Sequence, residues 1–241
     1  MVKAVITQPT YLPWMGYFGM IDAADIFVFF DDVQFVSRSW QCRNKIKTFD
    51  GAMWLSVPAA KESGQKIHEV KINNKLRWQD QHWKSIKHHY TKTPHFKKYE
   101  SFFKEVYAQE WKSLSELNIA IIKRMAEILK LNVKFVNASE LNAEGAKTDR
   151  LISVLQKIGA DEYIANPASK CYIEPEKFEK AGISLYWYEF EHPSYQQQFG
   201  KFRSHLSAID LLFNCGDKSI DLIREGGKNA LVKNEGIKVI K

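Results

Sequence analysis

Short continuous apolar runs recur along the chain between segments with helical periodicity. The runs occupy residues 2–7, 26–30, 133–136, 162–165 and 183–188. Runs of this length are typical of strands that are buried on both faces, as in a parallel sheet. A turn and a short helix, predicted over 18–24, join the first two runs into a strand–helix–strand unit with adjacent parallel strands. The pattern predicts an α/β fold, a Rossmann-like parallel sheet with flanking helices.

The middle of the chain has helical periodicity instead. Helices are predicted over 78–90, from Thr93-Pro94 onward, and over 111–131, where apolar residues recur at three- and four-residue spacing. Short strands at 54–57 and 68–72 precede them, and a further helix is expected from a cap at Thr148 to Gly159. We expect one α/β domain over 1–228, with a helical insertion at about 75–131 and a basic C-terminal tail at 229–241.

Composition and charge restrict the partners. Hydrophobic residues make up 45% of the 241 positions, which is enough for a large core. The formal net charge of +7 favours a small anionic substrate, such as a nucleotide or a phosphosugar. Nucleic acid is also anionic, but no signature of an RNA- or DNA-binding fold accompanies the charge, so we do not expect it as a partner.

Cysteine usage and the N-terminal sequence favour a cytoplasmic protein. The three cysteines, Cys42, Cys171 and Cys215, contain no Cys-x-x-Cys pair, which argues against a disulfide framework and against a zinc ribbon. The first residues lack the apolar segment of a signal peptide, and no uncharged apolar run reaches the roughly 18 residues that a bilayer span requires. We expect no membrane span, and the oligomeric state stays open.

Four loops follow predicted strands at the sheet edge where parallel sheets bind ligands. They cover residues 8–17, 31–34, 166–172 and 191–195. Because the strands are predicted to be parallel, we expect these four loops to converge on one face. Their polar content also exceeds what packing requires. A basic segment that contains Arg38, Arg43 and Lys47 adds a candidate clamp for phosphate or carboxylate, with a solvated face as the alternative.

Six motifs carry a resemblance to a known family. They are QPTYLPWMGYF, ADIFVFFDDVQF, RSWQCRNKIK, YIANPASKCYI, HPSYQQQF and HLSAIDLLFNCG. Together they resemble the WbqC-like protein family over nearly the whole chain. The resemblance implies a bacterial protein, similar to proteins encoded among surface-polysaccharide and amino-sugar biosynthesis genes. It implies motif positions at Gln8, Tyr11, Pro13, Trp14, Gly16, Tyr17, Asp31, Asp32, Gln34, Arg38, Arg43, Asn44, Tyr172, His192, Tyr195, Ser207 and Asp210.

The first motif is also similar in layout to nucleotidylyltransferases of the HxGH type. In those enzymes two histidines at the start of the first helix contact the nucleotide phosphates. Trp14 and Tyr17 stand at the two histidine positions here, so both imidazoles are missing. Gly16 could let a ligand approach the backbone at a helix N-terminus, and a simple turn glycine is the alternative.

Two residues are the candidates for acid–base catalysis. Asp31 follows a buried strand, and His192 lies in a loop after another strand; histidine normally titrates near neutral pH. Turn capping by Asp31 and a structural hydrogen bond from His192 are the alternatives. No metal site is expected, because no His or Cys stands at ligand spacing beside the aspartates. Substrate binding is assigned to Gln8, Tyr11, Trp14, Gly16, Tyr17, Asp32, Gln34, Arg38, Arg43, Asn44, Lys47, Ser169, Tyr172 and Tyr195.

The functional hypotheses rest on the family context. The first is a transferase acting on an activated or phosphorylated small molecule in amino-sugar or surface-polysaccharide biosynthesis, with acyl or aminoacyl transfer to a sugar amine as the first reaction to test. A nucleotide-dependent adenylyl or nucleotidyl transferase is the alternative, and a non-catalytic module that binds a glycan precursor is another. The cofactor is undetermined at this stage, with a nucleotide or a nucleotide-sugar as the candidate.

Overall fold

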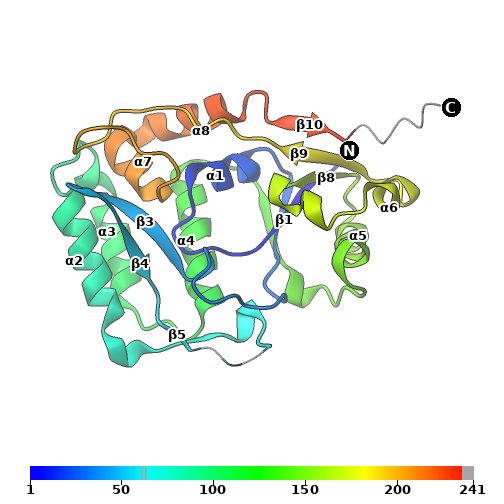
Figure 1. Ribbon diagram of the computed structural model, residues 1–241, viewed down its shortest axis with the longest axis horizontal. Coiled ribbons are helices and arrows are strands. Elements are labelled where there is room, and N and C mark those ends of the chain that lie inside the picture. The colour runs from blue at the N-terminus through cyan, green and yellow to red at the C-terminus, as the bar shows by residue number, and fades with distance from the viewer. Residues whose placement is uncertain (61, 63, 235–241) are drawn as a thin grey trace.

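A six-stranded sheet forms the centre of the protein (Figure 1). The computed structural model describes residues 1–60, 62 and 64–234. The sheet order is β10-β9-β8-β1-β2-β7, and only β10 runs antiparallel to its neighbour. The strands are β1 (Lys3–Thr7), β2 (Ile26–Phe29), β7 (Lys134–Asn137), β8 (Glu162–Ala165), β9 (Ser184–Tyr188) and β10 (Leu231–Lys233). The predicted Rossmann-like α/β class is therefore confirmed.

The first strand lies where the direction of chain progression reverses. Strand β1 pairs in parallel with β2 on one side, where Val5 faces Phe27, and with β8 on the other, where Val5 faces Ile164. The chain adds β2 and β7 outward from one edge of β1, and later adds β8 and β9 from the other edge. The carboxyl ends of β1 and β8 therefore flank the topological switch point, the usual ligand crevice of such sheets.

Helices cover both faces of the sheet, as the alternation along β1 requires. Val5 belongs to a core shared with α1, α4, α7 and α8, whereas Ala4 and Ile6 belong to a second core shared with α5 and α6. The helices on the first face are α1 (Met15–Asp22), α4 (Leu114–Ile128), α7 (Ala208–Cys215) and α8 (Ser219–Gly227). Those on the second face are α5 (Lys147–Ile158) and α6 (Pro175–Lys180).

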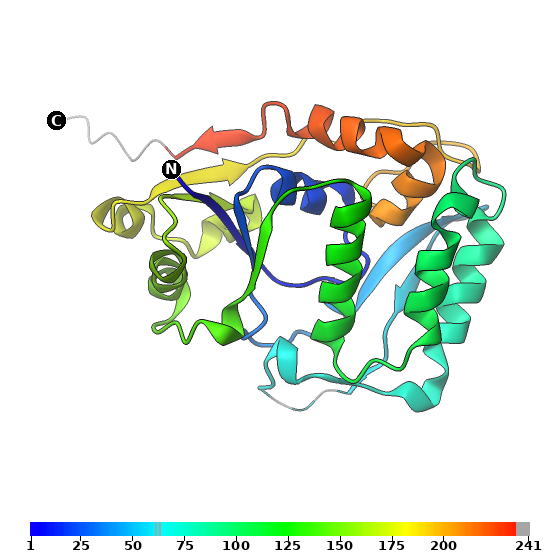
Figure 2. The ribbon, with the colours of Figure 1, turned by 180° about the vertical axis from the view of Figure 1, so that it is seen from behind.

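A long excursion between β2 and β7 extends the molecule at the end opposite α5 and α6 (Figures 1 and 2). It contains the hairpin β3 (Arg43–Thr48) and β4 (Gly51–Ser56), and the short pair β5 (Ala59–Ala60) and β6 (Lys71–Ile72). The helices α2 (Trp78–Tyr90), α3 (Phe96–Ala108) and α4 follow. Short 3-10 turns are η1 (Ile67–Glu69), η2 (Asn74–Leu76), η3 (Ala138–Glu140), η4 (Pro167–Cys171) and η5 (Gly216–Lys218).

Several boundaries differ from the sequence-based expectations. Helix α1 begins at Met15 rather than at residue 18, and α3 begins at Phe96, because the Thr93 hydroxyl donates to the Tyr90 carbonyl instead of capping a helix. Of the strand predicted over 68–72, His68 and Glu69 belong to the turn η1, and only Lys71 and Ile72 pair as a strand. Strand β10 lies within the expected C-terminal tail, and residues 235–241 of that tail fall outside the described residues.

Helix α4 illustrates how the sequence specifies this arrangement. Ser113 and Glu116 form a capping box, in which the Ser113 hydroxyl accepts from the Glu116 backbone N–H at 3.1 Å. The stripe predicted from periodicity, including Leu117, Ile121 and Met125, is fully buried. Within the residues that the structure describes, none of the helices combines the length and apolar character that crossing a bilayer would need.

Candidate functional site

The run that follows β1 is held in place by buried side chains from distant parts of the chain. Asn118 Nδ2 donates to the carbonyl oxygens of Pro9 (3.1 Å) and Gln41 (2.8 Å). Asn44 Nδ2 donates to the Leu12 carbonyl at 2.6 Å. These bonds satisfy backbone groups that no sheet or helix partner reaches, so the run forms a rigid frame.

Two tyrosines of the run belong to this frame. Tyr11 is completely buried, and its Oη shares hydrogen bonds with His82 Nδ1 (2.8 Å) and Tyr107 Oη (2.6 Å). Burial raises the pKa of Tyr11 well above its ordinary value. Tyr17 is also buried, and its hydroxyl donates to the Gln8 carbonyl at 3.1 Å. Neither tyrosine lines a described pocket, which leaves both as structural supports in this conformation.

Trp14 lies at the start of α1 and folds back over the helix. It occupies the N-cap position in an extended conformation, and its backbone forms a β-bridge with Ser207. A Cβ on Gly16 would overlap the Trp14 ring, so only glycine leaves room for the indole there.

A pocket of about 520 Å³ opens beside Trp14 at the switch point. We call it the switch-point pocket. It receives residues from the N-terminal part of α1, from the loop after β8 and from the segment after β9. Its lining is aromatic, amidic and acidic, without a Lys, Arg or His among the described residues: Trp14, Gly16, Met20, Asn166, Pro167, Tyr188, Glu189, Phe190, Glu191, Asn229 and Val232.

The two glutamates of this pocket are in different electrostatic situations. Glu189 Oε1 forms an ion pair with Lys170 Nζ at 2.7 Å. Glu191 is exposed and has no ion-pair partner within the described part of the chain. Its carboxylate is therefore available to a cation brought by a ligand.

Two histidines stack against Trp14 from the segment that follows β9. The ring centroids of His205 and His192 lie 5.4 and 6.2 Å from that of Trp14, with interplanar angles near 20°. The two imidazole centroids are 5.3 Å apart. The two imidazoles and the indole therefore form one aromatic cluster at the start of α1.

The two imidazoles differ in what their nitrogens can do. His192 Nδ1 lies 3.0 Å from the Pro193 carbonyl, which makes Nδ1 the protonated nitrogen, and Nε2 accepts from the His205 backbone N–H at 3.2 Å. Burial lowers the pKa of His192, in keeping with this neutral form. The His205 side chain is exposed and pairs through Nδ1 with Ser204 Oγ (2.8 Å), so its Nε2 faces no described partner. The structural hydrogen bond considered for His192 is therefore present. Of the two histidines, only His205 has a ring nitrogen, Nε2, without a hydrogen-bond partner among the described residues.

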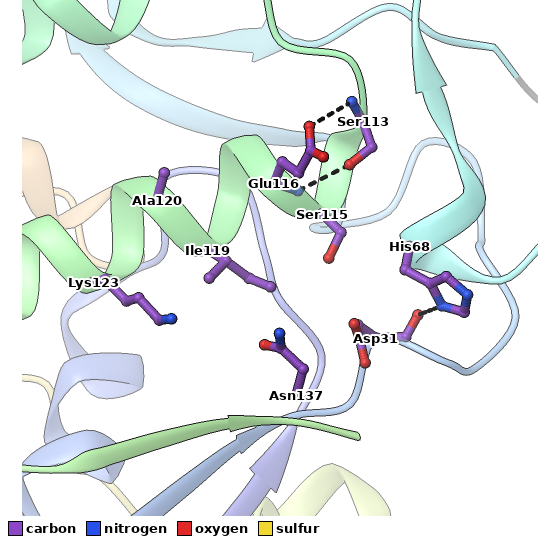
Figure 3. Close-up of a pocket in the computed structure, with 9 residues that line it drawn as sticks. All are labelled: Asp31, His68, Ser113, Ser115, Glu116, Ile119, Ala120, Lys123 and Asn137. Atoms are coloured by element: carbon purple, nitrogen blue, oxygen red, sulfur yellow. Dashed lines mark hydrogen bonds between the residues drawn. The ribbon is translucent and has the colours of Figure 1, made fainter. Parts of the chain in front are cut away.

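Asp31 lies apart from Trp14, His192 and His205. Its carboxylate accepts from Ser139 through the backbone N–H (2.9 Å) and the hydroxyl (2.8 Å). Asp31 lines a second pocket, of about 440 Å³, beside the ends of β2 and β7 (Figure 3). That second pocket, which we call the lysine pocket, is lined by Asp31, His68, Ser113, Ser115, Glu116, Ile119, Ala120, Lys123 and Asn137. Of the four loops expected on one face, three meet at the switch-point pocket and the loop after β2 lines the lysine pocket.

A buried polar network fixes the loop that carries the histidines. Asp210 is fully buried and accepts from the hydroxyls of Tyr90 (2.9 Å) and Tyr195 (2.8 Å) and from Gln197 Nε2 (2.8 Å). Lys47 Nζ, also buried, donates to Gln197 Oε1 at 2.8 Å. Burial raises the pKa of Asp210, and the donors and Lys47 work against that rise. Lys47 and Tyr195, expected at the substrate, are therefore tied into this network.

The remaining expected site residues lie on the surface or in the buried frame around the run that follows β1. Gln8 Oε1 accepts from Gln41 Nε2 at 2.8 Å, Asp32 forms an ion pair with Arg150, and the Ser169 hydroxyl donates to the Asn166 carbonyl at 2.6 Å. The guanidinium of Arg43 stacks on Trp54, 4.2 Å from the ring centroid. Exposed positions with no described pocket contact are Gln34, Arg38 and Tyr172.

Sequence reasoning did not single out the residues that now look best placed to contact ligands. Glu191 adjoins a candidate histidine, and the sequence favours a place near a helix cap for His205 rather than a place in the site. Lys123 and Ser115 lie on one face of the amphipathic helix α4. The apolar periodicity of that helix predicts its core contacts and gives no sign of a pocket. Among the described residues, no group of three or more His, Cys, Asp or Glu side chains is arranged to hold a metal ion.

The fold is a Rossmann-like α/β arrangement with a pocket at its topological switch point. The chain belongs to the WbqC-like protein family, whose model matches residues 8–222. It is similar to a Mycobacterium tuberculosis protein described as uncharacterized protein Rv1507c, with 32% identity over 228 residues that span 93% of this chain and 98% of that relative. No solved structure matches the chain at a significant level.

Proposed function

We propose that this chain is an enzyme that transfers an acyl or aminoacyl group from an activated or phosphorylated donor to the amine of a sugar, in amino-sugar and surface-polysaccharide biosynthesis. The observation that carries this proposal is the lining of the switch-point pocket. It combines aromatic rings, two amides and two carboxylates, and its described lining residues include no basic side chain. Such a lining suits a polyhydroxylated amine better than a phosphate.

Each part of the lining matches a part of an amino sugar. The rings of Trp14 and Phe190 pack edge to face at 5.4 Å and offer electron-rich surfaces to the C–H groups of a pyranose. Asn166 and Asn229 carry donors and acceptors for hydroxyl groups. The unpaired carboxylate of Glu191 would bind the ammonium group and orient it.

His205 is the group we assign to proton transfer. An ammonium group must lose a proton before its nitrogen can attack an acyl carbon. The Nε2 of His205, whose exposed ring stacks against Trp14, would accept that proton, whereas both ring nitrogens of His192 are engaged by the backbone. Asp31, the other expected catalytic residue, lines the lysine pocket and takes no part in this assignment.

The anionic donor has a candidate entry at the β3–β4 hairpin. Arg43 and Lys45 both stand over the Trp54 ring, at 4.2 and 4.7 Å from its centroid. The hairpin adjoins the site, because the Lys45 carbonyl accepts from the Ser207 backbone N–H at 2.9 Å and Ser207 bridges to Trp14. Cations held on an aromatic face suit a phosphorylated group.

Calorimetric titration with three related sugars tests the acceptor. Glucosamine should bind, whereas glucose and N-acetylglucosamine, which lack the charged amine, should bind at least about tenfold more weakly. Glu191→Gln should remove the preference for the amine, and Glu189→Gln, which alters the glutamate already paired with Lys170, is the matched control. Equal affinity for all three sugars would refute the proposal, and so would a preference that survives in Glu191→Gln.

A further inference from the structure

The lysine pocket shares no residue with the switch-point pocket. One stripe of helix α4 forms its wall, because Ser115, Ile119 and Lys123 follow one another at four-residue intervals. Ser115 and Lys123 are thus two turns apart, about 12 Å along the axis. Figure 3 shows Lys123 at one end of the pocket and Asp31 with Ser115 at the other.

The cationic end is built without a carboxylate partner. Lys123 Nζ lies 6.0 and 5.9 Å from the ring centroids of Phe29 in β2 and Phe135 in β7, which stack on each other. These cation–π contacts hold the ammonium group at the pocket. No ion pair to Lys123 occurs within the described residues, and Figure 3 shows its ammonium group directed toward Asn137.

The anionic end is held rigidly. The Asp31 carboxylate is fixed by two hydrogen bonds from Ser139, and its backbone carbonyl accepts from the backbone N–H (2.9 Å) and Nδ1 (3.0 Å) of His68. A carboxylate has about four acceptor sites, so Asp31 retains capacity for a further donor. The glutamate of the α4 capping box, Glu116, adds a second negative charge to the lining.

The hydroxyl of Ser115 lies next to the anionic end. Ser115 is 4% exposed, and Figure 3 shows its Oγ directed into the space between Ile119 and Asp31. No hydrogen bond to this hydroxyl is formed by the described residues. This Oγ is not among the buried polar atoms that lack a partner, so it reaches the pocket surface, where it can donate to or accept from a polar ligand.

We propose that the lysine pocket binds a free α-amino acid, with the ligand carboxylate on Lys123 and the ligand ammonium group against Asp31. The hydroxyl of Ser115 completes the contacts, and Ile119 and Ala120 face the ligand side chain. An amino acid carries both charges within one small molecule and so matches a cation and a carboxylate that stand too far apart to pair with each other. The volume of about 440 Å³ is within the usual range for small-ligand sites.

Ligand-observed NMR with a mixture of the twenty proteinogenic L-amino acids tests this inference on the full chain. At least one should bind at millimolar concentration or below. Its methyl ester, which lacks the carboxylate, and its N-acetyl derivative, which lacks the ammonium group, should each bind at least about tenfold more weakly. Absence of binding by every amino acid, or undiminished binding of either derivative, would overturn the proposal.

Matched variants locate the site. Lys123→Met and Ser115→Ala should each weaken binding, Lys123→Met by about tenfold or more. Lys104→Met makes the same change at an exposed position of α3 and should leave affinity unchanged. Ser115→Ala removes only one oxygen, so it keeps the test decisive should Lys123→Met fail to fold. Unchanged affinity in both pocket variants, or a loss in Glu191→Gln, would place the amino acid elsewhere and contradict the inference.

Discussion

The indole of Trp14 occupies the space that a side chain at Gly16 would need. Gly16→Ala should therefore displace the ring and lower the free energy of unfolding by about 1–3 kcal/mol, the usual cost of overpacking. In a Trp14→Ala background the same substitution should cost much less, with a coupling energy above about 0.5 kcal/mol. Urea unfolding of the two single variants and the double variant measures this coupling. Additive losses would mean that Gly16 is needed for another reason.

The free energy of unfolding should fall at acid pH because of His82. Burial lowers the pKa of this histidine from its ordinary value to about 4, and Tyr11 Oη lies 2.8 Å from its Nδ1. The unfolded chain takes up a proton below about pH 6.5, whereas the folded protein resists protonation down to about pH 4, so stability falls as the pH drops through this window. The contribution to the loss is about 2 kcal/mol at pH 5.

Urea unfolding at pH 7.5, 6 and 5 checks this origin. His82→Gln keeps an acceptor for Tyr11 but does not titrate, so its stability should change less between pH 7.5 and pH 5 than that of the parent. Equal slopes in the two proteins would assign the acid sensitivity to other groups.

The carboxylate at position 210 should be among the most sensitive positions in the chain. Asp210→Ala leaves the hydroxyls of Tyr90 and Tyr195 and the amide of Gln197 without their acceptor, and it should cost about 3 kcal/mol or more. Hydrogen exchange should also accelerate across residues 192–206, because the network fixes that loop. Asp217→Ala, which breaks an exposed ion pair with Lys98, is the control and should change melting little.

The two histidines beside Trp14 should respond differently to substitution. His192→Ala removes a ring that is bonded at both nitrogens and should lower the melting temperature. His205→Ala removes an exposed ring and should leave melting nearly unchanged, while any transfer to a sugar amine is abolished. Thermal melting and an amine-acceptor turnover assay distinguish the two. A large loss of stability in His205→Ala, or retained turnover, would contradict the roles assigned above.

Periodicity predicted five of the six strands of the sheet and the helices of the middle of the chain. The runs at 2–7 and 26–30 became parallel neighbours because their apolar character on both faces leaves few alternatives. The β3–β4 hairpin was predicted only in part, as a strand over 54–57, because Lys45 and Lys47 interrupt the apolar pattern of β3 and the Asp50-Gly51 turn at the tip was not recognised. Helix α8 and strand β10 were missed because both lie in polar sequence whose partners are distant in the chain.

The sequence predicted only those residues of the candidate site whose position follows from the order of the strands. Trp14 and Gly16 were found because they follow β1 at the switch point. Tyr11, Lys47 and Tyr195 have the chemistry of ligand contacts, but burial, which sequence cannot report, places them in internal networks. Lys123 was missed for the opposite reason, since a lysine on a helix normally signals a solvated face.

A crystal structure of the protein with bound glucosamine tests the central claim most directly. The sugar should lie in the switch-point pocket, with its ring against Trp14 and its ammonium group within hydrogen-bond distance of a Glu191 carboxylate oxygen. Density for the sugar in another pocket, or in this pocket with the amine directed away from Glu191, would contradict the assignment of this site to a sugar amine.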